Sequence, residues 1–393
     1  MLVFVNVLSS DLPASTRIVP DAPFPQPVLL MVRELNMGGC ERDAAKIATH
    51  IDRSRFTPHV GCFIAKGLRF DELNEKGIPV VEFPVRGFLS PSVLTGARAM
   101  ARYIRAHDIR LVHPFDVPTT IFGVPVARAC GIPGIASQLS YRNHLYSGRE
   151  LFLLRMVDHI STRIVVNSKA VQRHLVEEQS LQEDLTYLCY NGVDTNEFHP
   201  RGRQRLPAIK DSKLVIGIVC ALREEKGLAL LVEAFAKIRT ECESMKLVIV
   251  GDGLMRAQLE ILRDRLGLQN DMLLVPATSE VAAWMQSMDI FVLPSTSESF
   301  ANALLEAMAC GCCVIGSRVG GTPELIDDQV CGLLFNSGDL NGLVDCLKKV
   351  VRDDELRNRL ASAAARRAAT EFSMERNVTR TEELYTSLLS KAD

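Results

Sequence analysis

The chain has 393 residues, which at roughly 150 residues per domain predicts two or three domains rather than one. Its composition, 47% hydrophobic and 23% charged, is that of a globular protein and excludes disordered, collagenous and coiled-coil classes. Lys and Arg number 45 and Asp and Glu 47, so the net charge of −2 supplies no overall field that would attract nucleic acid. No nucleic-acid partner is expected, and any cationic site must be local.

The eleven cysteines are expected to be reduced, buried thiols, because their number is odd and the chain is too long to need disulfide bonds. Cys310, Cys312 and Cys313 lie close together, but no second pair at ligand spacing accompanies them, so no metal is expected. The first residues lack the basic segment of a secretory signal, and no apolar run reaches the roughly 18 residues that span a bilayer. We therefore expect a cytoplasmic protein without a metal or other cofactor.

Apolar runs and stretches of helical spacing alternate along the first half of the chain. The first run, 28–32, is followed by Gly38 and Gly39 and then by a helical stretch with apolar residues at 44–51. Further strands are expected at 59–64, 80–83, 110–113 and 132–137, with a helix at 93–106. The alternation predicts an α/β domain over residues 1–200 with a parallel sheet between helices.

A polar, basic and proline-interrupted segment at 199–213 is typical of a linker, and the same alternation resumes after it. Strands are expected at 214–220, 246–250, 272–275, 290–293 and 312–315, and helices at 228–239, 254–266, 281–288 and 301–309. This pattern predicts a second doubly wound domain over residues 201–372, with the active site in a cleft between the two domains. The last helix, within 373–393, is expected to pack back on the first domain.

The segment 294–311 carries two carboxylates, Glu298 in the loop after a strand and Glu306 about two turns inside the next helix. A carboxylate at the start of a helix is well placed to accept hydrogen bonds from a polyhydroxyl ligand. The backbone N–H groups of residues 300–303, including Phe300, Ala301 and Asn302, are expected to face a phosphate. The alternative is that both are ordinary helix acids, one complementing the helix dipole and one solvated.

Loops after the neighbouring strands add groups that suit a diphosphate. Arg223 and Lys226 follow the strand at 214–220, where cations could bind a diphosphate and stabilise its charge as it leaves. Gly251 and Gly253 follow the next strand, in a turn tight enough for the backbone to approach a ligand. Each loop alone also fits a solvated turn, but several consecutive strand ends of this kind favour a binding site.

Common nucleotide and hydrolase motifs are absent. Arg256 stands where a dinucleotide fingerprint beginning at Gly251 needs its third glycine, and Ser317 stands where a phosphate loop needs lysine. No His pair has metal spacing and no Gly-x-Ser-x-Gly elbow appears.

The order and spacing of the remaining motifs resemble the retaining nucleotide-sugar glycosyltransferases of family 4, which have the GT-B fold. In the second half the resemblance rests on 294–311, on Lys226-Gly227, on the GDG at 251–253 and on the GGTPE at 320–324. In the first half it rests on the glycine-rich loop at 38–42, the Asn-Ser turn at 167–168 and the segment 190–194. It covers roughly residues 28–390.

This resemblance implies two Rossmann-like domains facing across a cleft and a nucleotide-sugar donor. Glu298 would contact the hydroxyls of the donor sugar, and Glu306 those of the ribose. Arg223 and Lys226 would bind the diphosphate, which Gly38 and Gly39 would approach from the other domain; the N–H groups at 300–302 would add phosphate contacts. Transfer would proceed with retention and without a metal, and the leaving diphosphate itself would take the acceptor's proton.

The sequence departs from the family pattern at three places. Cys220-Ala221 stands where an arginine usually precedes the Lys-Gly pair, so that Arg223 would have to act from a displaced position. Ala301 stands where many members have glycine. The family's histidine after the strand at 132–137 is missing, which leaves Ser140 and Arg142 as candidates to contact the sugar or the acceptor, with His144 interpreted as a surface residue.

The acceptor is expected to be a glycan or a lipid-linked molecule used in glycan, polysaccharide or glycolipid biosynthesis. Two stretches of the first domain are basic: 142–173 has six Arg and Lys residues against Glu150 and Asp158, and 86–105 mixes arginines with apolar residues. A basic and apolar face of this kind could rest on anionic lipid. A peripheral contact with the inner face of a membrane is one interpretation, and an ordinary solvated amphipathic helix is the other. Two other functions stay open: a catalytically silent sugar-nucleotide-binding protein and a nucleotide-sugar epimerase.

Overall fold

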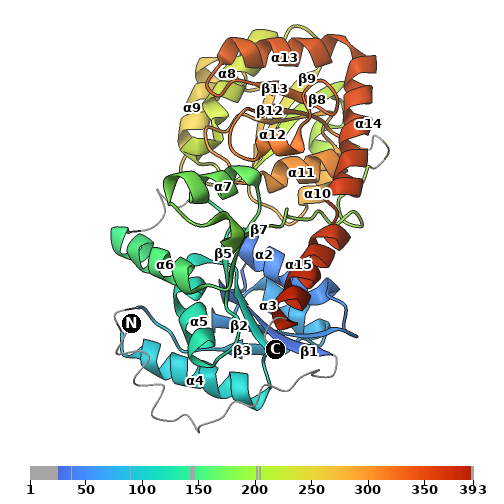
Figure 1. Ribbon diagram of the computed structural model, residues 1–393. Coiled ribbons are helices and arrows are strands. Elements are labelled where there is room, and N and C mark those ends of the chain that lie inside the picture. Colours follow the sequence, from blue (N-terminus) through green and yellow to red (C-terminus); the bar gives the residue numbers. More distant parts are fainter. Residues whose placement is uncertain are drawn as a thin grey trace. The chain divides into compact units, whose positions relative to one another are not determined.

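A computed structural model describes residues 25–36, 38–88, 90–141, 147–200, 202 and 205–390. The chain forms two compact units: Met1–Tyr190 together with Asn377–Asp393, and Asn191–Arg376. The crossings between units lie after Tyr190 and Arg376, whereas the sequence placed its boundaries at 200 and 372. Both units are α/β layers built on parallel sheets, as the sequence predicted (Figure 1).

The described residues of the first unit form seven parallel strands. Four pair in the order β3-β2-β1-β4 and three in the order β5-β6-β7, and a bridge between Val112 and Gly134 connects the two sets. The strands are β1 (Gln26–Glu34), β2 (Phe56–Ile64), β3 (Val80–Glu82), β4 (Leu111–Pro114), β5 (Ile135–Gln138), β6 (Arg163–Val166) and β7 (Thr186–Leu188). Helices cover both faces of this sheet, so the run at 28–32 in β1 is buried on both sides and consists of apolar residues without alternation.

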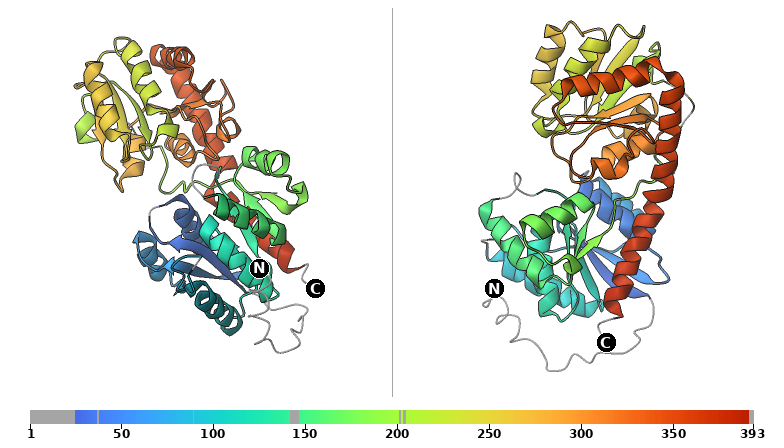
Figure 2. Two further views of the ribbon diagram at one scale, coloured as in Figure 1. Left: turned by 90° about the vertical axis from the view of Figure 1, so that its left-hand side faces the viewer. Right: turned by 45° about the horizontal axis from the view of Figure 1, so that its top comes forward.

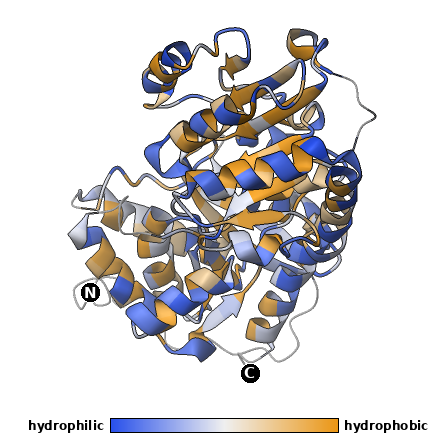
Figure 3. Ribbon diagram, turned by 90° about the horizontal axis from the view of Figure 1, so that it is seen from above, coloured by the Kyte–Doolittle hydropathy of each residue, from blue (hydrophilic) through white to orange (hydrophobic). Residues whose placement is uncertain are grey.

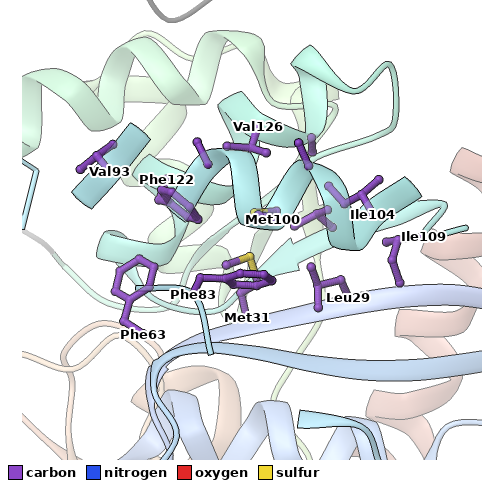
Figure 4. Close-up of a cluster of buried hydrophobic side chains, with 14 residues drawn as sticks. Leu29, Met31, Phe63, Phe83, Val93, Met100, Ile104, Ile109, Phe122 and Val126 are labelled. Atoms are coloured by element: carbon purple, nitrogen blue, oxygen red, sulfur yellow. The ribbon is translucent and has the colours of Figure 1, made fainter. Parts of the chain in front are cut away.

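Helices α4 (Ser92–Ala106) and α5 (Val117–Ala129) enclose a core on one face of this sheet, and other helices of the first unit cover the opposite face. The bounds of the remaining helices are α2 (Gly39–His50), α3 (Leu68–Glu75), α6 (Gly148–Ile160), α7 (Lys169–Arg173) and α15 (Met374–Leu389). In one buried cluster Leu29 and Met31 of β1 pack against Met100 of α4 and Phe122 of α5 (Figure 4). Each such side chain contributes about 1.5–3 kcal/mol of burial free energy. The cluster attaches α4 and α5 firmly to the sheet.

From residue 377 onward, α15 belongs to the first unit (Figure 2). Tyr385 is fully buried, with its ring edge-on to Phe56 at 5.8 Å between centroids and its hydroxyl 2.7 Å from Nδ1 of His113. Glu382 pairs with Arg55 at 3.1 Å. The last helix is therefore an integral part of the first unit's core.

The second unit has one six-stranded parallel sheet in the order β10-β9-β8-β11-β12-β13. Its strands are β8 (Leu214–Val219), β9 (Met245–Val250), β10 (Met272–Val275), β11 (Ile290–Leu293), β12 (Cys313–Ser317) and β13 (Leu333–Phe335). The chain winds from β8 outward through β9 and β10 and then returns to β11 on the other side of β8. In such sheets ligands bind at this reversal, beyond the carboxyl ends of the two central strands.

The α-helices in the described part of the second unit are α8 (Leu228–Ile238), α9 (Arg256–Arg265), α10 (Val281–Gln286), α11 (Asn302–Ala309), α12 (Thr322–Leu325), α13 (Leu340–Arg352) and α14 (Asp354–Glu371). Figure 3 shows hydrophobic strands beside helices that carry both hydrophobic and hydrophilic residues. Among the described residues, no helix is both long and apolar enough to cross a bilayer.

The cysteine group at 310–313 is part of this interior. Burial raises the pKa values of Cys310 and Cys313 to about 12, and the Cys312 thiol donates to the carbonyl oxygen of Met285 at 3.2 Å. The structure describes all eleven cysteines, and all are free.

Candidate functional site

The loop that follows β8 packs directly on the loop that follows β11. Gly227 has a φ of 63°, and a Cβ at this position would overlap the carbonyl oxygen of Pro294. Only glycine combines this backbone conformation with so close an approach. The N–H of Thr296 donates to the carbonyl oxygen of Glu225 at 2.8 Å. The reversal in strand order therefore brings residues 223–227 beside residues 294–298.

Lys226 and Glu298 form an ion pair at this reversal. Nζ of Lys226 lies 2.5 Å from Oε1 of Glu298, and the two side chains are 22% and 8% exposed. A charged pair so little exposed to water interacts more strongly than a surface pair. The structure thus brings together two residues that the sequence nominated independently, 72 positions apart.

Glu298 has a second contact that the sequence did not indicate. Oγ of Ser295 donates to the same Oε1 atom at 2.8 Å, and the backbone carbonyl oxygen of Glu298 accepts from the N–H of Gly321 at 3.3 Å. Oγ of Ser317, at the end of β12, donates in turn to the carbonyl oxygen of Ser295 at 2.5 Å. The loop that carries Glu298 is thereby attached to the end of the neighbouring strand β12, and the carboxylate itself is held by Ser295. Serine directly after Pro294 was the available signal, but nothing in the sequence showed where its hydroxyl would lie.

Glu306 lies in the second turn of α11, nearer the helix start than the sequence suggested, because α11 begins only at Asn302. Its side chain is buried, as is that of Glu298. Glu306 is therefore not the solvated helix acid that the alternative interpretation required. A buried carboxylate needs hydrogen-bond donors or positive charge around it.

The start of α11 is already partly occupied by contacts within the chain. The N–H of Asn302 donates to the carbonyl oxygen of Phe300 at 3.1 Å, and Oδ1 of Asn302 accepts from Nδ2 of Asn191 at 2.9 Å. Phe300 and Ala301 are both buried. The N–H of Asn302 therefore cannot reach a phosphate without first leaving Phe300.

The two glycines after β9 allow their backbone to pack closely against the loop after β8. Gly251 and Gly253 have φ values of 142° and 156°, and a Cβ at either would overlap a carbonyl oxygen of the β8 loop, that of Cys220 or Leu222. The N–H of Leu222 donates to the carbonyl oxygen of Asp252 at 2.9 Å. The close backbone approach that these glycines permit is thus to the loop that carries Lys226.

Arg223 differs from Lys226 in its surroundings. Its side chain is 58% exposed, and its guanidinium lies 3.8 Å from the carboxylate of Glu225. At the base of the same loop, burial raises the pKa of the Cys220 thiol to about 12, which leaves this thiol protonated and unreactive.

The remaining nominated residues belong to the first unit or are not described. Gly38 precedes α2 and Gly39 begins it, and the space around the Cβ direction of Gly39 is open. Ser140 is half-buried just beyond β5. Arg142 and His144 lie outside the described residues.

The first unit's own strand reversal, between β1 and β4, holds a residue that the sequence analysis missed. Asp116 accepts from the N–H of Thr119 at 2.9 Å and from the N–H of Arg33 at 2.6 Å, and burial raises its pKa. Aspartate directly before the first turn of a proline-containing helix was the available signal for a helix cap. All these contacts are within the protein, so Asp116 holds β1 and α5 together.

Comparison with known proteins relates each half of the chain to a protein family. The model for Glycosyltransferase Family 4 matches residues 37–197, and the model for glycosyl transferases group 1 matches residues 203–367.

Individual relatives match over part of their length. N-acetyl-alpha-D-glucosaminyl L-malate synthase of Bacillus anthracis is 33% identical over 203 residues, which cover 51% of this chain and 53% of the relative. N-acetylgalactosamine-N,N'-diacetylbacillosaminyl-diphospho-undecaprenol 4-alpha-N-acetylgalactosaminyltransferase of Campylobacter jejuni is 29% identical over 244 residues, which cover 62% and 64%. The matched segments thus span about half to just under two thirds of these relatives.

Solved structures match over a larger part of the chain. The Anabaena protein HepE in complex with UDP-glucose has a TM-score of 0.78 at 23% identity, over 92% of this chain and 100% of that chain. Sucrose-phosphate synthase of Thermosynechococcus elongatus has a TM-score of 0.77 at 18% identity, over 93% and 100%. At this identity the likeness shows that the fold is shared.

Proposed function

Because the chain belongs to the group 1 and family 4 glycosyltransferases of the GT-B fold, we propose that it transfers a sugar from a nucleotide-diphosphate sugar to an acceptor, with retention at the anomeric carbon. The observation that supports this most directly is the Lys226–Glu298 pair at the strand reversal of the second unit. A cation for phosphate and a carboxylate for hydroxyls are the two groups that a sugar diphosphate requires. The Anabaena structure holds UDP-glucose, so a uridine nucleotide is the first donor to test.

Each nominated side chain has a task in this reaction. Lys226, helped by the exposed Arg223, binds the diphosphate and stabilises the charge that grows as the bond from the sugar carbon to the phosphate oxygen breaks. Glu298 accepts hydrogen bonds from hydroxyls of the transferred sugar, and Glu306 from the ribose. The acceptor oxygen attacks the same face of the sugar, and its proton passes to the departing phosphate oxygen. No separate protein base is required for that proton.

Nucleotide binding is expected to raise the thermal stability of the protein. At a concentration 100 times Kd, a nucleotide that binds only the folded state adds about 2.7 kcal/mol. We expect a shift of several degrees with one of UDP, GDP and ADP, and a much smaller one for Glu306→Ala, which lacks the ribose carboxylate. Melting curves with each nucleotide provide the measurement, with Glu260→Ala, a glutamate on α9, as the matched control. A wild-type protein that responds to none of the three nucleotides would contradict the proposed function.

We further propose a lipid-linked acceptor, reached through a surface of the first unit made by α4 and α6. The helix α6 exposes Phe152 (64%) and Leu153 (38%) beside Arg149 and Arg155.

The helix α4 contains no acidic residue and exposes Leu94, Arg98 and Arg102. Both helices pack on α5. Apolar side chains among arginines match the chemistry of an anionic lipid surface. The Campylobacter relative is named for an undecaprenol-linked acceptor.

Vesicle binding is expected to depend on this surface. The wild-type protein should co-sediment with phosphatidylglycerol vesicles but not with phosphatidylcholine vesicles, and added salt should release it because salt screens the arginines. Phe152→Ser should weaken this binding about fivefold, since one large side chain contributes about 1 kcal/mol or more at an interface. Ile261→Ser, which removes an equally exposed apolar residue from α9 of the second unit, is the control. Equal losses in both variants would argue against the α4–α6 surface.

A further inference from the structure

We propose that Ser295 is a positioning residue that fixes the orientation of the Glu298 carboxylate. This inference rests on the proposed function, in which Glu298 contacts the transferred sugar, and it assigns Ser295 a role through Glu298 rather than through direct contact with the substrate.

The contact geometry singles out Ser295. Its side chain is fully buried, and its hydroxyl donates to Oε1 of Glu298 at 2.8 Å. Nζ of Lys226 lies 2.5 Å from the same oxygen. Because both contacts fall on Oε1, they restrict rotation of the carboxylate, and Oε2 is the oxygen that would accept hydrogen bonds from sugar hydroxyls.

The two contacts on Oε1 differ in rigidity. Lys226 carries its charge on a flexible four-carbon stem and has three N–H donors, so it turns easily toward an incoming diphosphate. The Ser295 hydroxyl sits one carbon from the backbone and cannot follow such a movement. When Lys226 engages phosphate, the serine is the contact that keeps Glu298 in place.

Ser295 is itself held by its neighbours. Its carbonyl oxygen accepts from Oγ of Ser317, which is fully buried at the end of β12, at 2.5 Å. The contact from Oγ of Ser337 to the same oxygen is 3.4 Å long and too weak to anchor it. Since β11 and β12 are adjacent parallel strands, the loop that carries Glu298 is fastened to the sheet itself. Small errors in the position of a catalytic group reduce rates steeply, so such anchoring has a direct effect on the rate of transfer.

Kinetics of the Ser295→Ala variant test this role. We expect kcat to fall about 10–30-fold and the donor KM to change by less than about threefold, because the lost contact orients the carboxylate and leaves the diphosphate site intact. Ser337→Ala is the matched control: it removes a hydroxyl that reaches the same carbonyl oxygen but does not touch Glu298, and its kcat should stay within about twofold of wild type. A kcat for Ser295→Ala equal to that of Ser337→Ala would overturn the proposal.

A double-mutant cycle separates action through Glu298 from a general effect on packing. In a Glu298→Ala background, replacing Ser295 by alanine should change kcat by less than about twofold, because the group that it positions is gone. Additive effects of the two substitutions on kcat would overturn the proposal.

The same cycle, measured by the urea midpoint of the second unit, needs no substrate. The shift of the urea midpoint in the double variant is expected to differ from the sum of the shifts in the two single variants. Additive shifts would show that the two side chains do not interact and would overturn the proposal. A wild-type protein that transfers no sugar from any donor, together with non-additive shifts, would refute the proposed function and leave the Ser295–Glu298 contact established.

Discussion

The Lys226→Ala variant is expected to bind its nucleotide-sugar donor about 10²–10³-fold more weakly than wild type and to fold normally. Removing the ammonium deletes a charge-assisted contact to the diphosphate, and it leaves the little-exposed Glu298 carboxylate facing that diphosphate without its cation. Losses of about 3–4 kcal/mol, which correspond to this range, are typical when one partner of such a charge pair is truncated. Titration calorimetry with the donor measures the affinity, and circular dichroism measures the fold.

Lys213→Ala is the matched control for this experiment. Lys213 belongs to the same unit and also pairs with a glutamate, Glu243, but its side chain is 63% exposed and lies at the start of β8, away from the strand reversal. Its removal should leave donor affinity within about twofold of wild type, as for most exposed ion pairs. Donor affinity retained in Lys226→Ala would contradict the assignment of Lys226 to the diphosphate.

The first unit is expected to lose about 2 kcal/mol of stability between pH 7 and pH 5 because of His113. This side chain is fully buried between Oγ of Ser137, 2.8 Å from Nε2, and the hydroxyl of Tyr385, 2.7 Å from Nδ1. Burial lowers its pKa to about 3, whereas in the unfolded chain it titrates near its ordinary value of about 6.5. Between these values the unfolded state binds more protons, so the contribution to stability is complete above about pH 6.5 and falls as the pH drops toward 3.

Chemical unfolding of the first unit at pH 7 and pH 5 measures this effect in wild type and in His113→Asn. The variant should be less stable at pH 7, because it disturbs a buried hydrogen-bonded network, but its stability should depend less on pH. Burial also lowers the pKa of His59, so His59 contributes part of the pH dependence of stability that remains in the variant. His50→Asn, on the outer side of α2, is the control. An unchanged pH dependence in His113→Asn would show that His113 does not titrate in this way.

The sequence predicted the second unit best where strands are continuous apolar runs ended by glycine or charged loops, as at β8, β9 and β11. It did not reveal α5, which contains Pro118 and Pro125 and is apolar on nearly every side. Proline and the absence of an amphipathic period argue against a helix locally. The complete burial of most of α5 in the first unit outweighs that local preference.

Local sequence patterns also did not predict the contacts within the candidate site. Glu298 and Lys226 could each be nominated from local spacing, but their contact depends on the reversal of strand order between β8 and β11, which no local pattern encodes. The hydroxyls of Ser295 and Ser317 gained a role only when adjacent strand ends were brought together. His113 and Tyr385, 272 positions apart, meet only because the last helix returns to the first unit.

That return also determines the order in which a newly made chain can fold. The second unit is one uninterrupted segment, Asn191–Arg376, and can form once the ribosome has released it. The first unit, although most of it is synthesised earlier, lacks Tyr385 and Glu382 until the whole second unit has been synthesised. The first unit thus reaches its native state only after the second unit has been synthesised, and until then the apolar surface that α15 covers is exposed to chaperones and to neighbouring chains.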